Sequence, residues 1–131
     1  MLLVLTSFFL FTNFISGFLR KYYLYAFIFF TLTITSIVNH ITHHPIANQI
    51  DLSVVWSVGI YGAYHVVTYM TLEKWYLVPL ILIFFSGTVI LYYYGRENDQ
   101  FCFDKDPILA KMYHGYLHIV GSTAHHLIMA L

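Results

Sequence analysis

The sequence predicts an all-α fold, a polytopic transmembrane helical bundle of about five helices that forms a single domain over residues 1–131. Of these residues, 60% are hydrophobic and only 9% are charged, which lies far outside the range of soluble domains. Six acidic and six basic side chains cannot cover the surface of a soluble domain of this size. The few polar clusters divide the chain into five apolar runs, and each approaches the roughly 20 residues that cross a bilayer core.

The first two predicted helices, 1–18 and 22–40, are joined by a tight turn at Arg20 and Lys21. A secretory signal peptide is the alternative interpretation of the first run, but this basic pair follows the apolar stretch instead of preceding it. Basic residues are balanced on the two sides of the predicted bundle, so the positive-inside rule decides the orientation only weakly. We expect the N-terminus on the outer or lumenal side, because the basic pair beside the first helix is then cytoplasmic.

The remaining three predicted helices are bounded by proline, amide and charged residues. The third, 51–70, is expected to begin at Asp51, which suits a helix N-terminus, after a break that contains Pro45. The fourth, 75–94, has aromatic residues at both ends, as is typical near a membrane interface. The fifth, 107–131, follows the longest polar stretch and starts at a proline. With five crossings, the loops before the third and fifth helices lie on the same side of the membrane.

Several polar side chains lie within these apolar runs, where an ionisable group is costly and usually faces a site. Ser36 and His40 are four residues apart and therefore share one face of the second helix, with Asp51 just across the next turn. His114 and His118 repeat this spacing near the start of the fifth helix, so both rings can point the same way. Since these helix ends share a side, we expect the five residues to converge.

A convergence of this kind predicts a zinc centre near one membrane surface. Three neutral imidazoles, from His40, His114 and His118, together with a water molecule complete a catalytic zinc sphere. Asp51 is then placed to orient the water or an imidazole, and Ser36 to donate to an oxyanion. Ser36 and Asp51 are therefore the catalytic candidates, and the three histidines are the metal-ligand candidates.

These residues resemble the three motifs of the CREST superfamily of membrane hydrolases, read here as Ser36-Ile-Val-Asn-His40, Asp51 and His114-Gly-Tyr-Leu-His118. The superfamily includes alkaline ceramidases, the progestin and adipoQ receptors, and GPI-remodelling lipases. The resemblance implies a zinc-dependent amidase or esterase that acts on membrane lipids, with the three histidines as metal ligands. Family members normally have seven helices, so this chain would be a reduced form, in which a fully enclosed lipid cavity requires dimerisation.

Two other interpretations of the polar residues stay open. The histidines would merely hydrogen-bond between helices in a non-catalytic subunit of a larger membrane complex, where Gly59 and Gly62 allow close helix approach. Alternatively, the deeper residues His65, His125 and His126 would bind haem, because histidine pairs on facing helices can ligate it axially. The formal net charge of zero gives no indication of a nucleic-acid partner.

Overall fold

The computed structural model describes all 131 residues and contains helices but no strand, which confirms the predicted all-α fold. The long helices are α1 (Leu2–Leu19), α2 (Tyr23–Thr42), α3 (Pro45–Tyr69), α4 (Leu77–Val89) and α6 (Pro107–Met129). A π-helical turn, η2 (Ile90–Tyr94), and the short α5 (Gly95–Asn98) continue α4 without a break. Two 3-10 turns, η1 (Leu72–Lys74) and η3 (Phe101–Phe103), lie in the connections.

Four helical segments are long and apolar enough to cross a membrane, namely Leu2–Leu19, Tyr23–Thr42, Pro45–Tyr69 and Leu77–Phe103. Many of their large apolar side chains face outward: Phe27 is 65% exposed, Val67 82% and Ile83 65%. Water does not tolerate so much continuous apolar surface, so the chain is a membrane protein. Helix α6 is not among the four, because it carries four histidines and Lys111.

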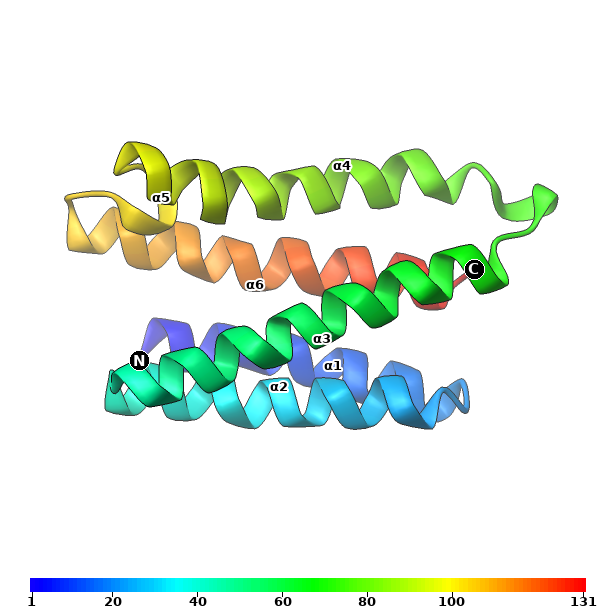
Figure 1. Cartoon of the computed structure of the whole chain (residues 1–131), viewed down its shortest axis with the longest axis horizontal. Helices are drawn as coiled ribbons and strands as arrows, with labels where there is room; N and C mark the ends of the chain where they lie inside the picture. Colours follow the sequence, from blue (N-terminus) through cyan, green and yellow to red (C-terminus); the bar gives the residue numbers. More distant parts are fainter.

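Helix α1 packs against both α2 and α6. Helix α3 packs against α2 and also contacts α6, while α4 packs against α6. Figure 1 shows α1 and α6 running in the same direction along the long axis. It also places the α2–α3 turn and the α5–α6 connection at the end that holds the N-terminus. The two loops predicted to share a side therefore lie at one end of the bundle.

Helix α3 begins at Pro45 and not at Asp51, so the predicted start of the third helix was wrong. Proline occupies the first turn, where its missing N–H leaves no helical hydrogen bond unmade. His44 caps this end, because its Nδ1 accepts a hydrogen bond of 3.2 Å from the backbone N–H of Ile46. Pro45 therefore starts a helix and does not interrupt one. Asp51 consequently lies inside α3, where its side chain can face α2.

The fourth helical rod also differs from the prediction, because Gly95 does not end it. Gly95 has helical φ and ψ values of −60° and −40°, and the rod continues to Asn98. A Cβ at position 95 would lie 2.5 Å from the carbonyl oxygen of Gln100. The glycine therefore makes room for the returning loop, and Asp99, with φ at 52°, ends the helix instead.

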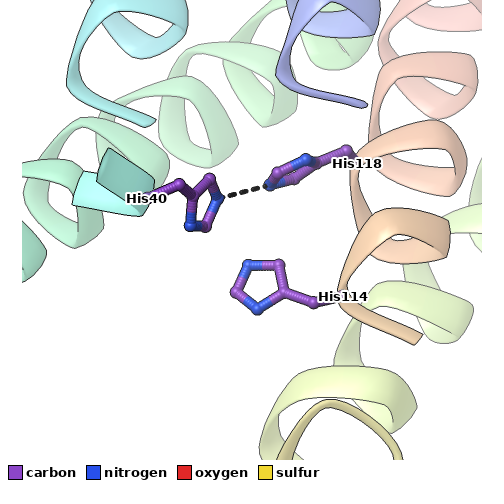
Figure 2. A group of neighbouring side chains, drawn as sticks. All are labelled: His40, His114 and His118. Atoms are coloured by element: carbon purple, nitrogen blue, oxygen red, sulfur yellow. Dashed lines mark hydrogen bonds between the residues drawn. The ribbon is translucent and has the colours of Figure 1, made fainter. Parts of the chain in front are cut away.

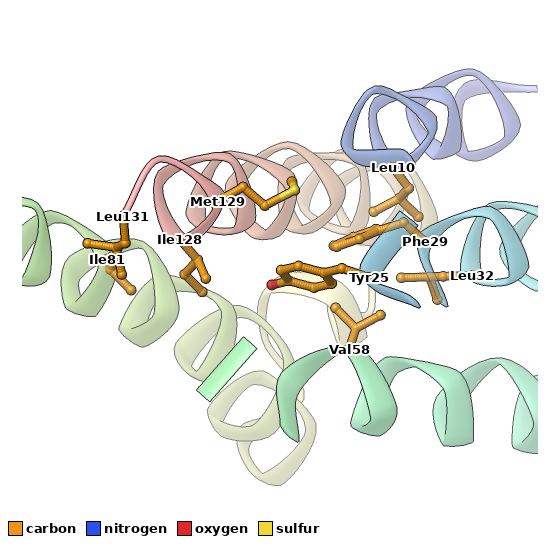
Figure 3. Packing of buried hydrophobic residues seen from close by; sticks show 9 residues of the cluster. All are labelled: Leu10, Tyr25, Phe29, Leu32, Val58, Ile81, Ile128, Met129 and Leu131. Carbon is orange, nitrogen blue, oxygen red and sulfur yellow. The ribbon is translucent and has the colours of Figure 1, made fainter. Parts of the chain in front are cut away.

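The apolar core lies where α2, α3 and α6 meet, shown in Figure 3 with Tyr25 near its centre. Tyr25, Phe29 and Met129 are almost completely buried, at 0%, 1% and 0% exposure. Buried polar residues line the contacts that α1 makes with α2 and α6, and they include Thr6, Ser7, Asn13, Ser36, His118 and Ser122. Because α1 packs against both α2 and α6, its hydroxyl groups lie against the two helices that carry the candidate ligands.

Candidate metal centre

Three imidazole rings meet near the end of the bundle that holds the α2–α3 turn. His40 comes from the end of α2, and His114 and His118 come from successive turns of α6. One ring nitrogen of each residue lies within 4.8 Å of those of the other two. Figure 2 shows the three rings directed into the space between the two helices. His118 is buried and the other two are half-buried, so the group is sheltered without being sealed.

The three rings form a nearly equilateral triangle. Their centroids lie 5.0 Å apart for His40 and His114, 5.2 Å for His40 and His118, and 5.1 Å for His114 and His118. The pair on α6 is close because residues four apart occupy the same face of a helix. His40 joins them because α2 and α6 both pack against α1. One ion can therefore be approached by all three rings.

The nitrogen separation fits zinc. Nε2 of His40 lies 3.4 Å from Nε2 of His118. Two nitrogens that are each about 2.0–2.1 Å from a tetrahedral zinc ion lie about 3.3 Å from one another, so this pair needs little movement to share an ion. Three imidazoles also leave one position of a four-coordinate ion open. The three side chains can therefore hold a metal ion.

Ser36 lies one turn before His40, and its hydroxyl points to α1. Its Oγ is 3.1 Å from the Oγ of Ser7. Ser7 gives its own hydroxyl hydrogen to the carbonyl oxygen of Leu3, at 2.8 Å, so Ser36 must be the donor to Ser7. The hydroxyl of Ser36 therefore links α2 to α1, and the predicted donation to an oxyanion requires it to turn away from Ser7.

Asp51 lies against α2, and its hydrogen bonds do not go to any of the three imidazoles. One carboxylate oxygen accepts from the hydroxyl of Thr35 at 2.8 Å, and the other accepts from the side-chain amide of Asn39 at 3.3 Å. These two donors lie next to Ser36 and His40 in the sequence. Asp51 therefore holds the turn of α2 that carries His40 and makes no hydrogen bond to an imidazole. Its predicted role in orienting the water stays a prediction.

One residue of the centre was missed by the sequence analysis. The hydroxyl of Thr6, on α1, lies 3.0 Å from Nδ1 of His118, and this contact is buried. The only signal in the sequence is that Thr6 and Ser7 are adjacent polar residues in a mainly apolar run, a feature that Thr12 and Asn13 share. A hydroxyl in such a run often hydrogen-bonds to a neighbouring helix, but the run itself does not indicate which helix is the neighbour.

The deeper histidines lie outside this cluster. His65 is completely buried, and its ring packs against Tyr22 and Tyr69 with centroids 4.5 and 4.3 Å away. His126 contacts the hydroxyl of Thr12 through Nε2, at 2.8 Å. Two histidines of α6, His114 and His118, therefore belong to the cluster, whereas the other two contact other helices individually.

His125 packs tightly against both α2 and α3. Its Nδ1 shares a hydrogen bond with the hydroxyl of Tyr25, and a Cβ on Gly62 would lie 2.8 Å from its Cε1. A planar haem between α3 and α6 would have to displace these contacts. Gly62 thus permits a close helix approach, as predicted, whereas Gly59 has no atom near the position of its missing Cβ.

Comparisons with protein-family models, with curated proteins and with solved structures found no match. The chemistry of the centre therefore rests on its own residues and their geometry.

Proposed function

We propose that this chain is a multi-pass integral membrane protein whose three-histidine centre binds zinc and hydrolyses an amide or ester bond of a membrane lipid, as ceramidases do. The observation that carries the proposal is the convergence of His40, His114 and His118 from two helices. The 3.4 Å separation of two Nε2 atoms and the resemblance to the CREST motifs support it. The proposal includes five membrane crossings, which place the α2–α3 and α5–α6 connections on one side of the membrane.

The three histidines would hold the ion as neutral rings, since a protonated imidazole has no lone pair to offer. When bound in such a site, zinc lowers the pKa of water and polarises a carbonyl group. Asp51 contributes by holding the turn of α2 that carries His40, through Thr35 and Asn39. Ser36 lies one turn away, where its hydroxyl can donate to the carbonyl oxygen of the substrate once it no longer donates to Ser7.

A lipid substrate is favoured by the surroundings of the centre. The helices that carry it are apolar on the outside, so molecules that reach it laterally come from the bilayer. A shallow, mostly apolar groove of about 190 Å³ lies between α1 and α6 and is lined by Leu2, Thr6, Met112, Gly115, Tyr116 and Ile119. Thr6 connects this groove to the centre, because its hydroxyl contacts His118.

The proposal is tested by metal analysis followed by hydrolysis assays. The chain is purified in detergent without chelator, its zinc content is measured, and fluorescent ceramide and ester analogues are offered as substrates. We expect about one zinc ion per chain, as a single closed ligand set requires. Hydrolysis should stop when a chelator removes the ion and return when zinc is restored. A chain without stoichiometric zinc rejects the proposal.

A second candidate is a non-catalytic subunit of a larger membrane complex. The observation in its favour is that Ser36 and Asp51 both bond neighbouring helices. This candidate predicts no hydrolysis of any lipid, with or without metal, and co-purification with other chains or with a second copy. A Soret band in the absorbance spectrum would identify haem as its cofactor, whereas a zinc centre is colourless.

A further inference from the structure

We infer that Thr6 is a positioning residue of the three-histidine centre, which accepts the Nδ1 hydrogen of His118 and so leaves Nε2 as the ring nitrogen that binds metal. The inference rests on the proposed zinc site. It extends that site to α1, a helix that supplies none of the ligands.

Hydrogen-bond accounting at Thr6 fixes the direction of the contact. A threonine hydroxyl has one hydrogen to donate, and the carbonyl oxygen of Leu3 accepts it at 3.1 Å. Nδ1 of His118 lies 3.0 Å from the same Oγ1. Since the hydrogen is already used, the oxygen can only accept from the ring. A neutral His118 therefore carries its hydrogen on Nδ1, and its Nε2 has a free lone pair.

The free nitrogen is the one that faces the centre. Nε2 of His118 lies 3.4 Å from Nε2 of His40, as Figure 2 shows with a dashed line. With the other tautomer, a hydrogen on Nε2 would occupy the position where an ion binds. Histidine ligands usually donate their second N–H to an acceptor, and removing that acceptor costs about 10–100-fold in metal affinity.

Packing holds the hydroxyl in place. Thr6 and His118 are each only 8% exposed, so water is poorly placed to substitute for the hydroxyl. On α6, Gly115 faces Thr6, and a Cβ there would lie 3.2 Å from its Cγ2 methyl. The absence of a side chain at position 115 thus allows α1 and α6 to approach closely enough for the contact with His118.

The same turn of α1 also contacts α2, the helix that carries His40. The carbonyl oxygen of Leu3 accepts from both Thr6 and Ser7, at 3.1 and 2.8 Å. With its hydrogen directed to Leu3, Ser7 accepts from Ser36 on α2. One carbonyl group therefore sets the polarity of two interhelical contacts, one to each helix that carries ligands.

The chain contains a matched control for Thr6. Further along α1, Thr12 gives its hydrogen to the carbonyl oxygen of Phe9 at 2.6 Å and lies 2.8 Å from Nε2 of His126 on α6. Both threonines therefore link α1 to a histidine of α6 through the same donor pattern. His126 is outside the metal cluster, so Thr12 should support packing without affecting metal binding.

The test compares Thr6→Val, Thr6→Ser and Thr12→Val with the wild-type chain in detergent, using competition with a chelator to measure zinc affinity. We expect Thr6→Val to weaken affinity about 10–100-fold, Thr6→Ser to restore most of it, and Thr12→Val to bind as the wild type does. Circular dichroism and gel filtration establish that each variant is folded. Wild-type affinity in a folded Thr6→Val chain overturns the inference, and so does an equal loss in Thr12→Val.

A second measurement needs no variant. Nitrogen NMR of ¹⁵N-histidine-labelled, metal-free wild-type chain reports which nitrogen of His118 carries the hydrogen, with His118→Gln used to assign its signals. We expect the hydrogen on Nδ1, and a predominant hydrogen on Nε2 overturns the inference. If the wild-type chain takes up no zinc, the proposed function fails, whereas this tautomer measurement still decides whether Thr6 positions the ring.

Discussion

Nε2 of His40 and Nε2 of His118 lie 3.4 Å apart, although the two residues are 78 positions apart in the chain. The pair exists because α2 and α6 both pack against α1, with their side chains in contact beside it. Changes to the ligands, to the groups that hold them and to the packing between helices should therefore have different effects on metal content and stability.

Replacing a ligand should remove the ion. His114→Ala or His118→Ala is expected to weaken zinc binding by more than about 100-fold, because losing even a supporting acceptor costs about 10–100-fold. Zinc content per chain after gel filtration measures the effect. His126→Ala is the control, and it should keep its zinc because His126 lies outside the cluster. Full zinc in both ligand variants would exclude this centre.

Asp51→Asn should spare the ion and reduce turnover. Asparagine retains one oxygen that can accept from Thr35 or Asn39, but it loses the second acceptor and the negative charge. We expect nearly full zinc content and a roughly tenfold lower rate of lipid hydrolysis, the lower range for a supporting group. Zinc loss as complete as in His118→Ala would instead make Asp51 a ligand.

Acidification should release the metal. Protons compete with zinc for imidazole nitrogens, and the ordinary pKa of histidine is about 6.5. Occupancy should be full near neutral pH and fall on acidification, since protonated rings cannot bind. Because three rings take part, release should take up more than one proton per ion, so the pH curve should be steeper than a single titration. Equilibrium dialysis measures the zinc content between pH 7.5 and pH 4.5. A zinc content that does not change over this range would contradict the prediction.

Cysteine labelling tests the five crossings. In a Cys102→Ala background, which removes the single native and buried thiol, we expect Thr42→Cys and Asn98→Cys to react from the same side of sealed vesicles. Lys21→Cys and Glu73→Cys should react from the opposite side, since their loops lie at the other end of the bundle (Figure 1). Labelling of positions 42 and 98 from opposite sides would exclude this topology and the shared site.

Two glycines of α3 provide a matched test of packing. Gly62→Ala should destabilise the bundle by about 1–3 kcal/mol, the usual cost of overpacking, because the new Cβ would lie 2.8 Å from Cε1 of His125. Gly59→Ala has open space around it and should stabilise α3 by up to about 1 kcal/mol through helix propensity. Thermal unfolding in detergent measures both, and equal shifts would show that α3 and α6 are not in close contact.

The helices themselves could largely be predicted from the sequence, because apolar runs interrupted by polar clusters leave few alternatives for a chain in a bilayer. The exceptions are the end of the fourth rod, which continues past Gly95, and the start of α3, where proline is compatible with either a break or a first helical turn. His44 decides between them, since its ring caps Ile46, and a capping contact of this kind depends on side-chain geometry that a pattern of residue types does not contain.

The site was predictable to the extent that it depends on spacing within a helix. The four-residue interval of His114 and His118 and the position of His40 at a helix end are local features. The partners of Ser36 and His118 are not, because they depend on α1 packing against both α2 and α6. Thr6 and Ser7 acquire their roles only from this arrangement, and so could not be assigned from the first apolar run alone.

The contact between α1 and α6 also constrains the order of events during synthesis. Thr6 and His118 are 112 positions apart, so at about 5–20 residues per second the ribosome needs roughly 5–25 s to supply the second partner. Until then Thr6 lacks His118 and His40 lacks the other two imidazoles, and the groups of α1 that pair with α6 face lipid or transient partners. Metal uptake should consequently mark the arrival of the last helix in the membrane, and a stalled chain that ends before α6 should present unpaired hydroxyl groups to the machinery that removes unassembled membrane proteins.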